Sequence, residues 1–323
     1  MKRIFKKVLK VILTIVIVIA IILCTMTIIS RYKEAHYYNY ADAAGTIEKK
    51  YTAMGTYSVA RQSIKANDDQ IKSYEIYYPS ALETSVEQYP LVIMVNGTGY
   101  PVSKYREVLK HLASWGFIVA GNEDEQSRSG ESSARTLDYL ITSNSDSSSI
   151  FYNRIDTGRI GIAGHSQGGV GAINAVTEQS NGSKYKAIWT ASTTSPFWAQ
   201  DDILGSTWSY DISKVAIPCM MVAGTGTWDA GTATDITATE GQGICPLWSL
   251  TQNYEVINNT VPKVMGRLTG KDHGDMLRYA DGYMTAWFML WLKGDTEADA
   301  FFQDSPEILN NSRWQDVRVS AGK

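Results

Sequence analysis

The sequence predicts an α/β domain built on a doubly wound, mostly parallel sheet, with a transmembrane helix in front of it. Three observations support this prediction. Residues 91–95 and 117–120 are short, continuously apolar runs, which are typical of strands that a parallel sheet buries on both faces. Segments with apolar residues at helical spacing separate such runs, so strands and helices alternate along the chain. In addition, residues 11–29 form an uncharged stretch long enough to span a bilayer.

The N-terminal region predicts an uncleaved signal anchor. Five basic residues in segment 1–10 precede the apolar stretch 11–29. At about 1.5 Å per residue this stretch reaches roughly 28 Å, whereas the apolar region of a cleavable signal peptide is usually about 7–15 residues long. No small-residue cleavage pattern follows it. The basic residues predict that the N-terminus is cytoplasmic and that the rest of the chain is extracytoplasmic.

Charge and composition narrow the class of protein. Without the five positive charges of residues 1–10, the formal net charge of −3 becomes −8, so nucleic acid is not an expected partner. The polar, Tyr-rich residues 30–53 have no clear periodicity and predict a stalk. Residues 54–323 are expected to form a single domain, because they hold enough apolar residues for one sizeable core and no obvious second one.

The first part of the domain alternates strands and helices. Residues 71–78 alternate in polarity and end at Pro79, as expected of a half-exposed strand near a sheet edge. Residues 135–141 predict a helix, and the polar loop 143–149 leads to the next strand. Between the two continuously apolar strands, another helix is expected from apolar residues at helical spacing, namely Tyr105, Val108, Leu109 and Leu112.

The most informative motif is Gly-His-Ser-Gln-Gly at residues 164–168, which lies between the apolar run 160–163 and the small-residue stretch 169–176. It predicts a nucleophile elbow, a sharp strand-to-helix turn that presents the hydroxyl of Ser166. Glycines two residues on either side of the serine fit this turn, because a Cβ there would collide with the neighbouring strand or helix. The alternative is an ordinary Gly-rich turn.

Further strands are expected at residues 186–190, 219–223 and 261–268, followed by a last helix at 279–292. In such a sheet the active site lies at the carboxyl ends of the strands. Cys219 and Cys245 are the cysteines outside the predicted membrane span. An extracytoplasmic location permits a disulfide between these two cysteines, and two free thiols are the alternative.

His273 is the expected base. A serine nucleophile needs a base that takes its proton, and the sequence has four histidines. His36 lies in the stalk, His111 lies inside the first helix of the domain, and His165 belongs to the turn itself. His273 follows the last predicted core strand and precedes the last helix, which places it at the edge of the sheet where the site is expected.

Asp229 is the preferred acid to orient His273. The acid is expected between the nucleophile and the base in chain order, after a core strand, and Asp229 meets both conditions. Asp235 in the same loop and Asp202, one strand earlier, are the alternatives. Asp272 is too close to His273 in the sequence to hold the ring from its far side.

Gln167 and Thr98 are the expected donors of an oxyanion hole. Each donor aimed at a developing oxyanion is typically worth about 2.7–4 kcal/mol. The backbone N–H of Gln167, at the start of the helix after Ser166, supplies the first donor. The loop 96–100 supplies the second through the amide of Thr98, whose hydroxyl is a further candidate. The alternative for this loop is a plain glycine turn.

With these residues placed, residues 51–303 resemble the bacterial cutinase and polyester-hydrolase branch of the α/β-hydrolases, which is related to dienelactone hydrolases and lipases. The resemblance implies an α/β-hydrolase fold and the hydrolysis of carboxylic esters through an acyl-enzyme, without a metal ion or an organic cofactor. Gln167 and Thr98 depart from the pattern of cutinases, which usually have a methionine and an aromatic residue there. Besides the turn at Ser166, the likeness rests on residues 112–119, 154–156, 195–198 and 286–293.

The sequence therefore predicts a membrane-anchored, extracytoplasmic serine esterase that acts on a small-molecule, lipid or polymer ester. Tyr100, Trp198 and Trp228 are expected at the mouth of its cleft, where aromatic walls bind acyl chains or aromatic acids. Trp208 and Trp248 are expected to be packing residues. A peptidase or acyltransferase with the same residues, and a catalytically silent cell-surface binding domain, are the alternative functions.

Overall fold

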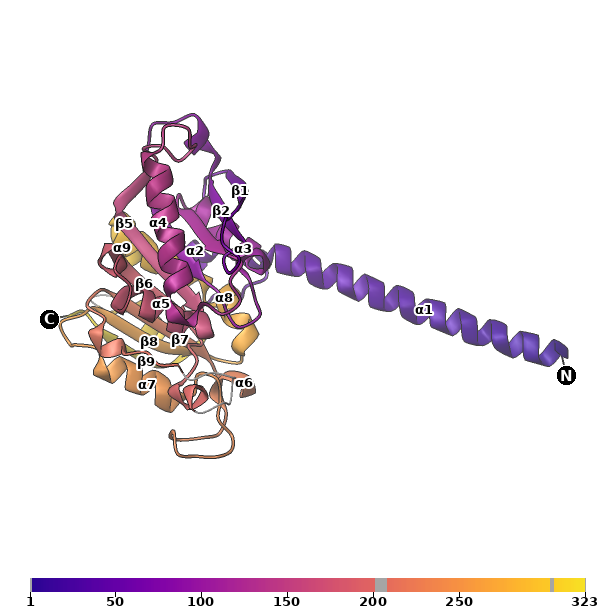
Figure 1. Cartoon of the computed structure of the whole chain (residues 1–323). Coiled ribbons are helices and arrows are strands. Elements are labelled where there is room, and N and C mark those ends of the chain that lie inside the picture. Colours follow the sequence, from indigo (N-terminus) through magenta and orange to yellow (C-terminus); the bar gives the residue numbers. More distant parts are fainter. Residues whose placement is uncertain (1, 201–207, 303–304, 323) are drawn as a thin grey trace. The chain divides into compact units, whose positions relative to one another are not determined.

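In the computed structural model, which describes residues 2–200, 208–302 and 305–322, the chain divides into two units, Met1–Ala41 and Asp42–Lys323. The first unit consists mainly of the long helix α1 (Lys2–Ala35; Figure 1). The described apolar side chains of this helix are exposed along its length. Within the described residues, α1 alone is long and apolar enough to cross a membrane. By length and composition it fits a transmembrane anchor or a signal sequence, and it extends beyond the expected span 11–29 at both ends.

The described part of the second unit is built on one sheet, in the order β1-β2-β4-β3-β5-β6-β7-β8-β9. The strands from β4 to β8 in this order are parallel, whereas β1, β2 and β9 run antiparallel to their neighbours. From β3 the chain goes to β4 on one side and then to β5 on the other, which is the doubly wound pattern that the sequence predicts. The strands are β1 (Val59–Lys65), β2 (Ser73–Pro79), β3 (Tyr89–Val95), β4 (Ile118–Asn122), β5 (Ile155–His165), β6 (Tyr185–Ala191), β7 (Cys219–Gly224), β8 (Lys263–Leu268) and β9 (Trp314–Ser320).

Helices cover both faces of this sheet (Figure 1). On one face, α4 (Glu131–Ser145), α5 (Gln167–Thr177) and α7 (Leu247–Val256) contribute apolar side chains to the main core cluster. On the other face lie α3 (Arg106–Ser114) and α9 (Asp281–Lys293), which are joined by an ion pair between His111 and Asp281. The remaining helices are short, namely α2 (Thr46–Thr52), α6 (Thr227–Ala230), α8 (Met276–Tyr279), α10 (Thr296–Asp299) and α11 (Glu307–Asn310).

The second unit begins earlier than residue 54, where the sequence places the start of the domain. It includes Asp42 onward, and α2 buries Ile47 and Tyr51. The carboxylate of Glu48, only 1% exposed, accepts hydrogen bonds from Asn311 at 2.8 Å and from the Trp314 indole at 2.9 Å. The predicted stalk 30–53 is therefore too long, because the second half of this polar segment belongs to the second unit, where it contacts both the C-terminal part of the chain and α3.

β2 lies beside the edge strand, near the sheet edge as predicted for residues 71–78, but it is buried and not half-exposed, which corrects that part of the prediction. β1, which the sequence did not predict, pairs antiparallel with β2 along its outer side and occupies the edge. Consequently six of the seven residues of β2 are buried. The alternating polar side chains remain compatible with burial because they find partners, as Glu75 does with Arg61 at 2.7 Å.

The two cysteines of the second unit are free thiols. Cys219 and Cys245 are both fully buried. Burial raises the pKa of Cys219 to about 12 and that of Cys245 well above its usual range, so neither thiol is a reactive nucleophile at neutral pH.

Candidate active site

Ser166 occupies a strained turn between β5 and α5. Its φ of 60° and ψ of −128° lie where L-residues are seldom found, and such strain is concentrated at functional sites. Two glycines make the turn possible. A Cβ on Gly164 would lie 2.0 Å from the carbonyl oxygen of Gly168, and a Cβ on Gly168 would lie 2.2 Å from that of Val95. These close approaches are the steric reason for the glycine spacing in the sequence.

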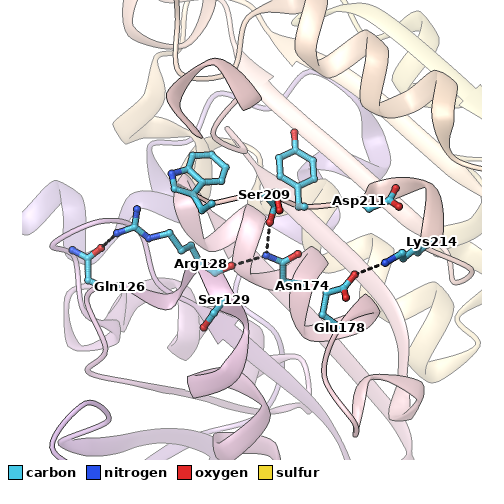
Figure 2. A pocket seen from close by; sticks show the side chains of 10 residues that line it. Gln126, Arg128, Ser129, Asn174, Glu178, Ser209, Asp211 and Lys214 are labelled. Atoms are coloured by element: carbon cyan, nitrogen blue, oxygen red, sulfur yellow. Dashed lines mark hydrogen bonds and ion pairs between the residues drawn. The ribbon is translucent and has the colours of Figure 1, made fainter. Parts of the chain in front are cut away.

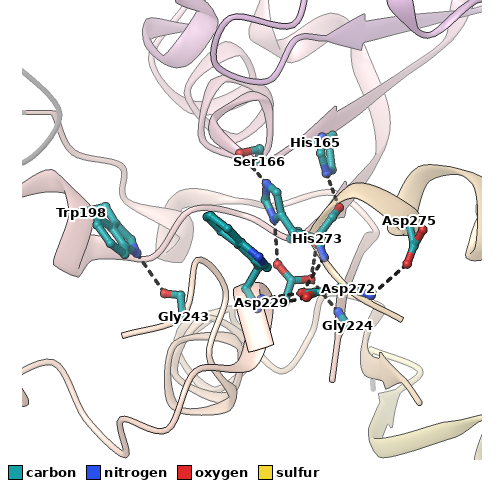
Figure 3. Close-up of polar contacts among 11 residues, drawn as sticks. His165, Ser166, Trp198, Gly224, Asp229, Gly243, Asp272, His273 and Asp275 are labelled. Carbon is teal, nitrogen blue, oxygen red and sulfur yellow. Dashed lines mark hydrogen bonds and ion pairs between the residues drawn. The ribbon is translucent and has the colours of Figure 1, made fainter. Parts of the chain in front are cut away.

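His273 and Asp229 reach Ser166 from the carboxyl ends of neighbouring strands. His273 begins the 3₁₀ helix η8 (His273–Asp275) after β8, and Asp229 lies in α6 after β7. The Nε2 atom of His273 is 3.0 Å from the Oγ of Ser166, and its Nδ1 is 2.7 Å from the Oδ1 of Asp229 (Figure 3). The structure thus brings together the three side chains that the sequence singled out.

The carboxylate of Asp229 is completely buried, and both of its oxygens have partners. Its Oδ2 accepts a hydrogen bond from the hydroxyl of Ser192 at 2.5 Å and another from the N–H of Gly224 at 2.7 Å, while Oδ1 faces His273. Buried carboxylates are tolerated when they are hydrogen-bonded in this way. The same contacts fix the orientation of the carboxylate toward the imidazole.

The alternative acids have different environments. Asp235 accepts hydrogen bonds from the hydroxyl and the N–H of Thr237, which lower the pKa of its carboxyl, and no contact joins it to His273 in the described part of the chain. Asp202 lies outside the described residues. Of the candidates that the structure describes, Asp229 contacts the imidazole.

The carboxylate of Asp272 holds together the segments that carry Asp229 and His273, because it is hydrogen-bonded to the backbone of both. It accepts three backbone hydrogen bonds, from Trp228 at 3.1 Å, Asp229 at 2.9 Å and His273 at 2.8 Å. Burial acts to raise the pKa of Asp272, but these hydrogen bonds outweigh it and lower the pKa, so the carboxylate is charged. One part of this role has a sequence signal: the three-residue spacing of Asp272 and Asp275 is typical of a capping box at the start of η8. The bonds of Asp272 to α6 have no sequence signature.

His165 also positions His273, a contribution that sequence reasoning missed. Its Nε2 is 2.8 Å from the backbone carbonyl oxygen of His273, and the two rings are 4.7 Å apart. Burial and the neighbouring His273 lower the pKa of His165 to about 3, so its ring is neutral at physiological pH. The neutral ring carries its proton on Nε2 and donates it to the carbonyl oxygen, which fixes the main chain at His273.

The loop that carries Thr98 is tied to the turn at Ser166. The carbonyl oxygen of Glu125 accepts hydrogen bonds from the N–H of Gly99 at 3.2 Å and from the side-chain amide of Gln167 at 2.7 Å. Thr98 is exposed, and its N–H has no hydrogen-bond partner in the described chain. Gln167 is the first residue of α5, where a backbone N–H has no acceptor within the helix. Neither backbone N–H has an acceptor in the part of the chain that the structure describes.

The three aromatic residues expected at the cleft differ in their surroundings. Trp228 directly precedes Asp229 and is 73% exposed, and Tyr100, in the Thr98 loop, is 37% exposed. Trp198 donates its indole N–H to the carbonyl oxygen of Gly243 at 2.9 Å (Figure 3). Trp228 and Tyr100 therefore present aromatic surface beside the segments that carry the acid and the oxyanion donors.

Within the ranges that the structure describes, no group of three or more His, Cys, Asp or Glu residues is arranged to hold a metal ion.

Comparisons with known proteins identify the family. A comparison with curated proteins gives no match. The family model described as PET hydrolase-like matches residues 40–318, which include Ser166, Asp229 and His273 and most of the second unit. The match also begins close to Asp42, where that unit begins. On this evidence, the chain belongs to the PET hydrolase-like family, a group of α/β-hydrolases similar to cutinases and polyester hydrolases.

Proposed function

We propose that the chain is a serine hydrolase that cleaves carboxylic esters through a covalent acyl-enzyme. The observation that carries this proposal is the continuous hydrogen-bonded series from Ser166 through His273 to Asp229, with distances of 3.0 and 2.7 Å. Membership of the PET hydrolase-like family supports an ester as the bond that is cleaved.

In the proposed mechanism, His273 Nε2 takes the hydroxyl proton of Ser166 while Oγ attacks the carbonyl carbon of the ester. Asp229 holds Nδ1–H and stabilises the imidazolium that forms. The N–H groups of Thr98 and Gln167 donate to the oxyanion. Collapse of the tetrahedral intermediate breaks the ester C–O bond, and His273 gives its proton to the departing alkoxide oxygen. Water, activated by the same histidine, then attacks the acyl-enzyme and releases the acid and free Ser166.

The substrates proposed for this site carry an apolar or aromatic acyl group. Tyr100, Trp198 and Trp228 are the residues proposed to bind it, because aromatic side chains bury large apolar areas against such groups. The exposed surface of Trp228 supports this role most directly, since that residue adjoins the proposed acid Asp229.

We also propose that α1 anchors the protein in a membrane and that the second unit is extracytoplasmic. The apolar part of α1 is long enough to cross a bilayer, and none of its most apolar window is buried. The cluster of basic residues before this part supports a cytoplasmic N-terminus.

The decisive test of the proposed function is Ser166→Ala. This variant is expected to lose p-nitrophenyl ester hydrolysis and labelling by a fluorophosphonate, while its free energy of unfolding stays within about 1 kcal/mol of the wild type. Ser148→Ala, which alters an exposed serine in another loop, is the matched control and should label like the wild type. Labelling that persists in Ser166→Ala would exclude Ser166 as the nucleophile. A panel of esters of increasing acyl length, run beside peptide amides and acyl acceptors, distinguishes an esterase from a peptidase or an acyltransferase.

A further inference from the structure

The side chain of Gln167 has no part in the proposed hydrolysis, although the backbone N–H of the same residue is a proposed oxyanion donor. This side chain is 3% exposed, at the first position of α5 and directly after Ser166. Its amide nitrogen donates to the backbone carbonyl oxygen of Glu125 at 2.7 Å. Every residue except proline supplies a backbone N–H at position 167, so a substitution there tests the side chain alone.

The same carbonyl oxygen holds the loop that carries Thr98. The N–H of Gly99 donates to this oxygen at 3.2 Å. The N–H of Tyr100 donates to the carbonyl oxygen of Gly97 at 3.1 Å, which closes a turn over residues 97–100. Gly99 has a φ of 63°, which is typical of the third residue of a type II turn. Of the four residues in this turn, Thr98 is the one whose N–H makes no hydrogen bond to the described chain.

Glu125 lies in a loop whose position is itself fixed. The side-chain amide of Asn96, 1% exposed, donates to the carbonyl oxygens of Asn122 and Asp124, both at 2.6 Å. The carbonyl oxygen of Asn96 accepts a hydrogen bond from the hydroxyl of Ser127 at 2.7 Å. These bonds lie on both sides of Glu125 in the sequence. Its carbonyl oxygen is therefore a fixed acceptor to which the segments that carry both proposed oxyanion donors are bound.

Stability does not account for the side chain of Gln167. Its Oε1 is buried and has no hydrogen-bond partner among the described residues, which is unfavourable. If the side-chain amide were absent, the carbonyl oxygen of Glu125 would still accept from the N–H of Gly99. A methionine at position 167 would therefore remove one unpaired buried group without leaving another.

We propose that Gln167, through its side chain, is a positioning residue for the oxyanion hole, an inference that rests on the proposed ester hydrolysis at Ser166. The side chain donates to the carbonyl oxygen that also holds Gly99, and it thereby sets where the N–H of Thr98 lies relative to that of Gln167. Donors stabilise a transition state most when they are in place before its charge develops. Loss of this hydrogen bond therefore weakens binding of the transition state and leaves binding of the ester unchanged.

The test compares Gln167→Met with the wild type of the full-length protein in the hydrolysis of p-nitrophenyl butyrate. Removal of an oxyanion donor costs about 10²–10³ in kcat, and a displaced donor should cost less, so we expect kcat to fall about tenfold. Acylation and deacylation both pass through an oxyanion, so KM should stay within about twofold of the wild type. The melting temperature should equal or exceed that of the wild type, because an unpaired buried oxygen is removed.

Inhibition by an alkyl trifluoromethyl ketone gives a second measurement that reports on the oxyanion hole directly. In the inhibited enzyme, Oγ of Ser166 bonds to the ketone carbon, its proton passes to His273, and the ketone oxygen becomes an oxyanion. The inhibition constant should rise about tenfold in Gln167→Met, in parallel with the fall in kcat, because the adduct resembles the transition state.

Gln126→Met is the matched control, because Gln126 belongs to the same loop as Glu125. Its side chain lines a separate pocket, where it is hydrogen-bonded to Arg128 (Figure 2). The kcat and the inhibition constant of this variant should equal those of the wild type. Gln167→Leu, which also lacks the amide, should behave as Gln167→Met does and covers the case in which the methionine variant does not fold.

An unchanged kcat in Gln167→Met or Gln167→Leu, beside wild-type hydrolysis that depends on Ser166, would overturn this inference alone. A melting temperature that falls together with the activity would show that the side chain is structural, and an equal loss of activity in Gln126→Met would also contradict the inference. A wild type without Ser166-dependent hydrolysis would overturn the proposed function as well.

Discussion

Asp229 differs from the alternative acid of its loop, Asp235, in what surrounds its carboxylate. It is fully buried, with donors from Ser192 and Gly224 on the oxygen that does not face His273. Asp235 accepts only from nearby groups of its own exposed loop. A carboxylate whose orientation is fixed from behind can hold an imidazole in one tautomer, whereas a solvated one cannot.

We therefore expect Asp229→Asn to reduce kcat for a p-nitrophenyl ester by about three to four orders of magnitude, with little change in KM. Asp235→Asn, the matched control, should stay within about threefold of the wild type, because removal of a solvated charge has little effect on the transition state. Steady-state kinetics of both variants decides which of the two aspartates is the catalytic acid. The reverse pattern would assign the acid to Asp235, and two active variants would point to Asp202 or to another group.

Among single residues of the site, the sequence predicts those that must have one particular side chain at one particular turn or strand end. Ser166 is recognisable because steric constraints demand glycines at fixed spacing around it, and His273 and Asp229 because they follow core strands. Asp272 and His165 were not assigned a role. Both act on backbone groups of other segments, and the backbone N–H and C=O groups that they bind are present at almost every position of a sequence.

Among the elements, α3 and α9 are joined by a buried histidine. His111 presents Nδ1 to the carboxylate of Asp281 at 2.8 Å and Nε2 to the carbonyl oxygens of Thr52 and Ala53 at 3.0 and 2.9 Å. Because both ring nitrogens face acceptors, the imidazolium satisfies this geometry better than the neutral ring. Burial acts to lower the pKa of His111, but Asp281 and the two carbonyls outweigh it and raise the pKa.

This arrangement predicts a pH-dependent contribution to stability. Since the folded pKa lies above the unfolded value of about 6.5, the contribution is fully present below that pH and is lost as the pH rises through the folded pKa. The double variant His111→Gln/Asp281→Asn removes the ion pair without leaving a lone buried charge. The difference in free energy of unfolding between wild type and double variant should be larger at about pH 6 than at about pH 9 in denaturant titrations. A difference that does not change with pH would show that His111 is neutral in the folded protein.

Buried elements were predicted better than peripheral ones, for a physical reason. The parallel strands β3 to β8 are covered on both faces, which requires continuous apolar runs that can be recognised in the sequence. The edge strands β1 and β9 have mixed burial, and their places depend on backbone pairing with β2 and β8. Likewise α2 is short, and it buries Glu48 among partners far away in the sequence, so no local pattern predicts it.

The position of α2 predicts where the chain can be shortened. A chain that starts at Asp42 should fold and hydrolyse a soluble ester as the full-length protein does, because it retains the whole second unit. A chain that starts at Met54 lacks Ile47 and Tyr51, whose burial contributes about 1.5–3 kcal/mol each, and it leaves Asn311 and Trp314 without Glu48. Its free energy of unfolding should fall by several kcal/mol in urea titrations. Equal stability of the two chains would mean that α2 is dispensable.

For the whole molecule, the two units differ in whether their apolar side chains are exposed to water. The described apolar side chains of α1 are exposed along the helix, whereas the second unit buries its apolar side chains in its own core. An exposed apolar surface of this size is unfavourable in water and favourable in lipid. The second unit therefore has its own core, and α1 has the length and composition of a membrane anchor or of a signal sequence.

The charge distribution then predicts the orientation in the membrane. The five basic residues of segment 1–10 precede the apolar stretch, and only Arg31 and Lys33 follow it closely, so the N-terminus should remain in the cytoplasm. Protease added to intact cells is expected to degrade the second unit, whereas an epitope fused before Met1 should survive until the cells are lysed. The control is an epitope fused after Lys323, which should disappear without lysis. Protection of the C-terminal epitope would reverse the orientation, and a shortened, soluble form in the medium would show that α1 is a cleaved signal sequence instead of an anchor.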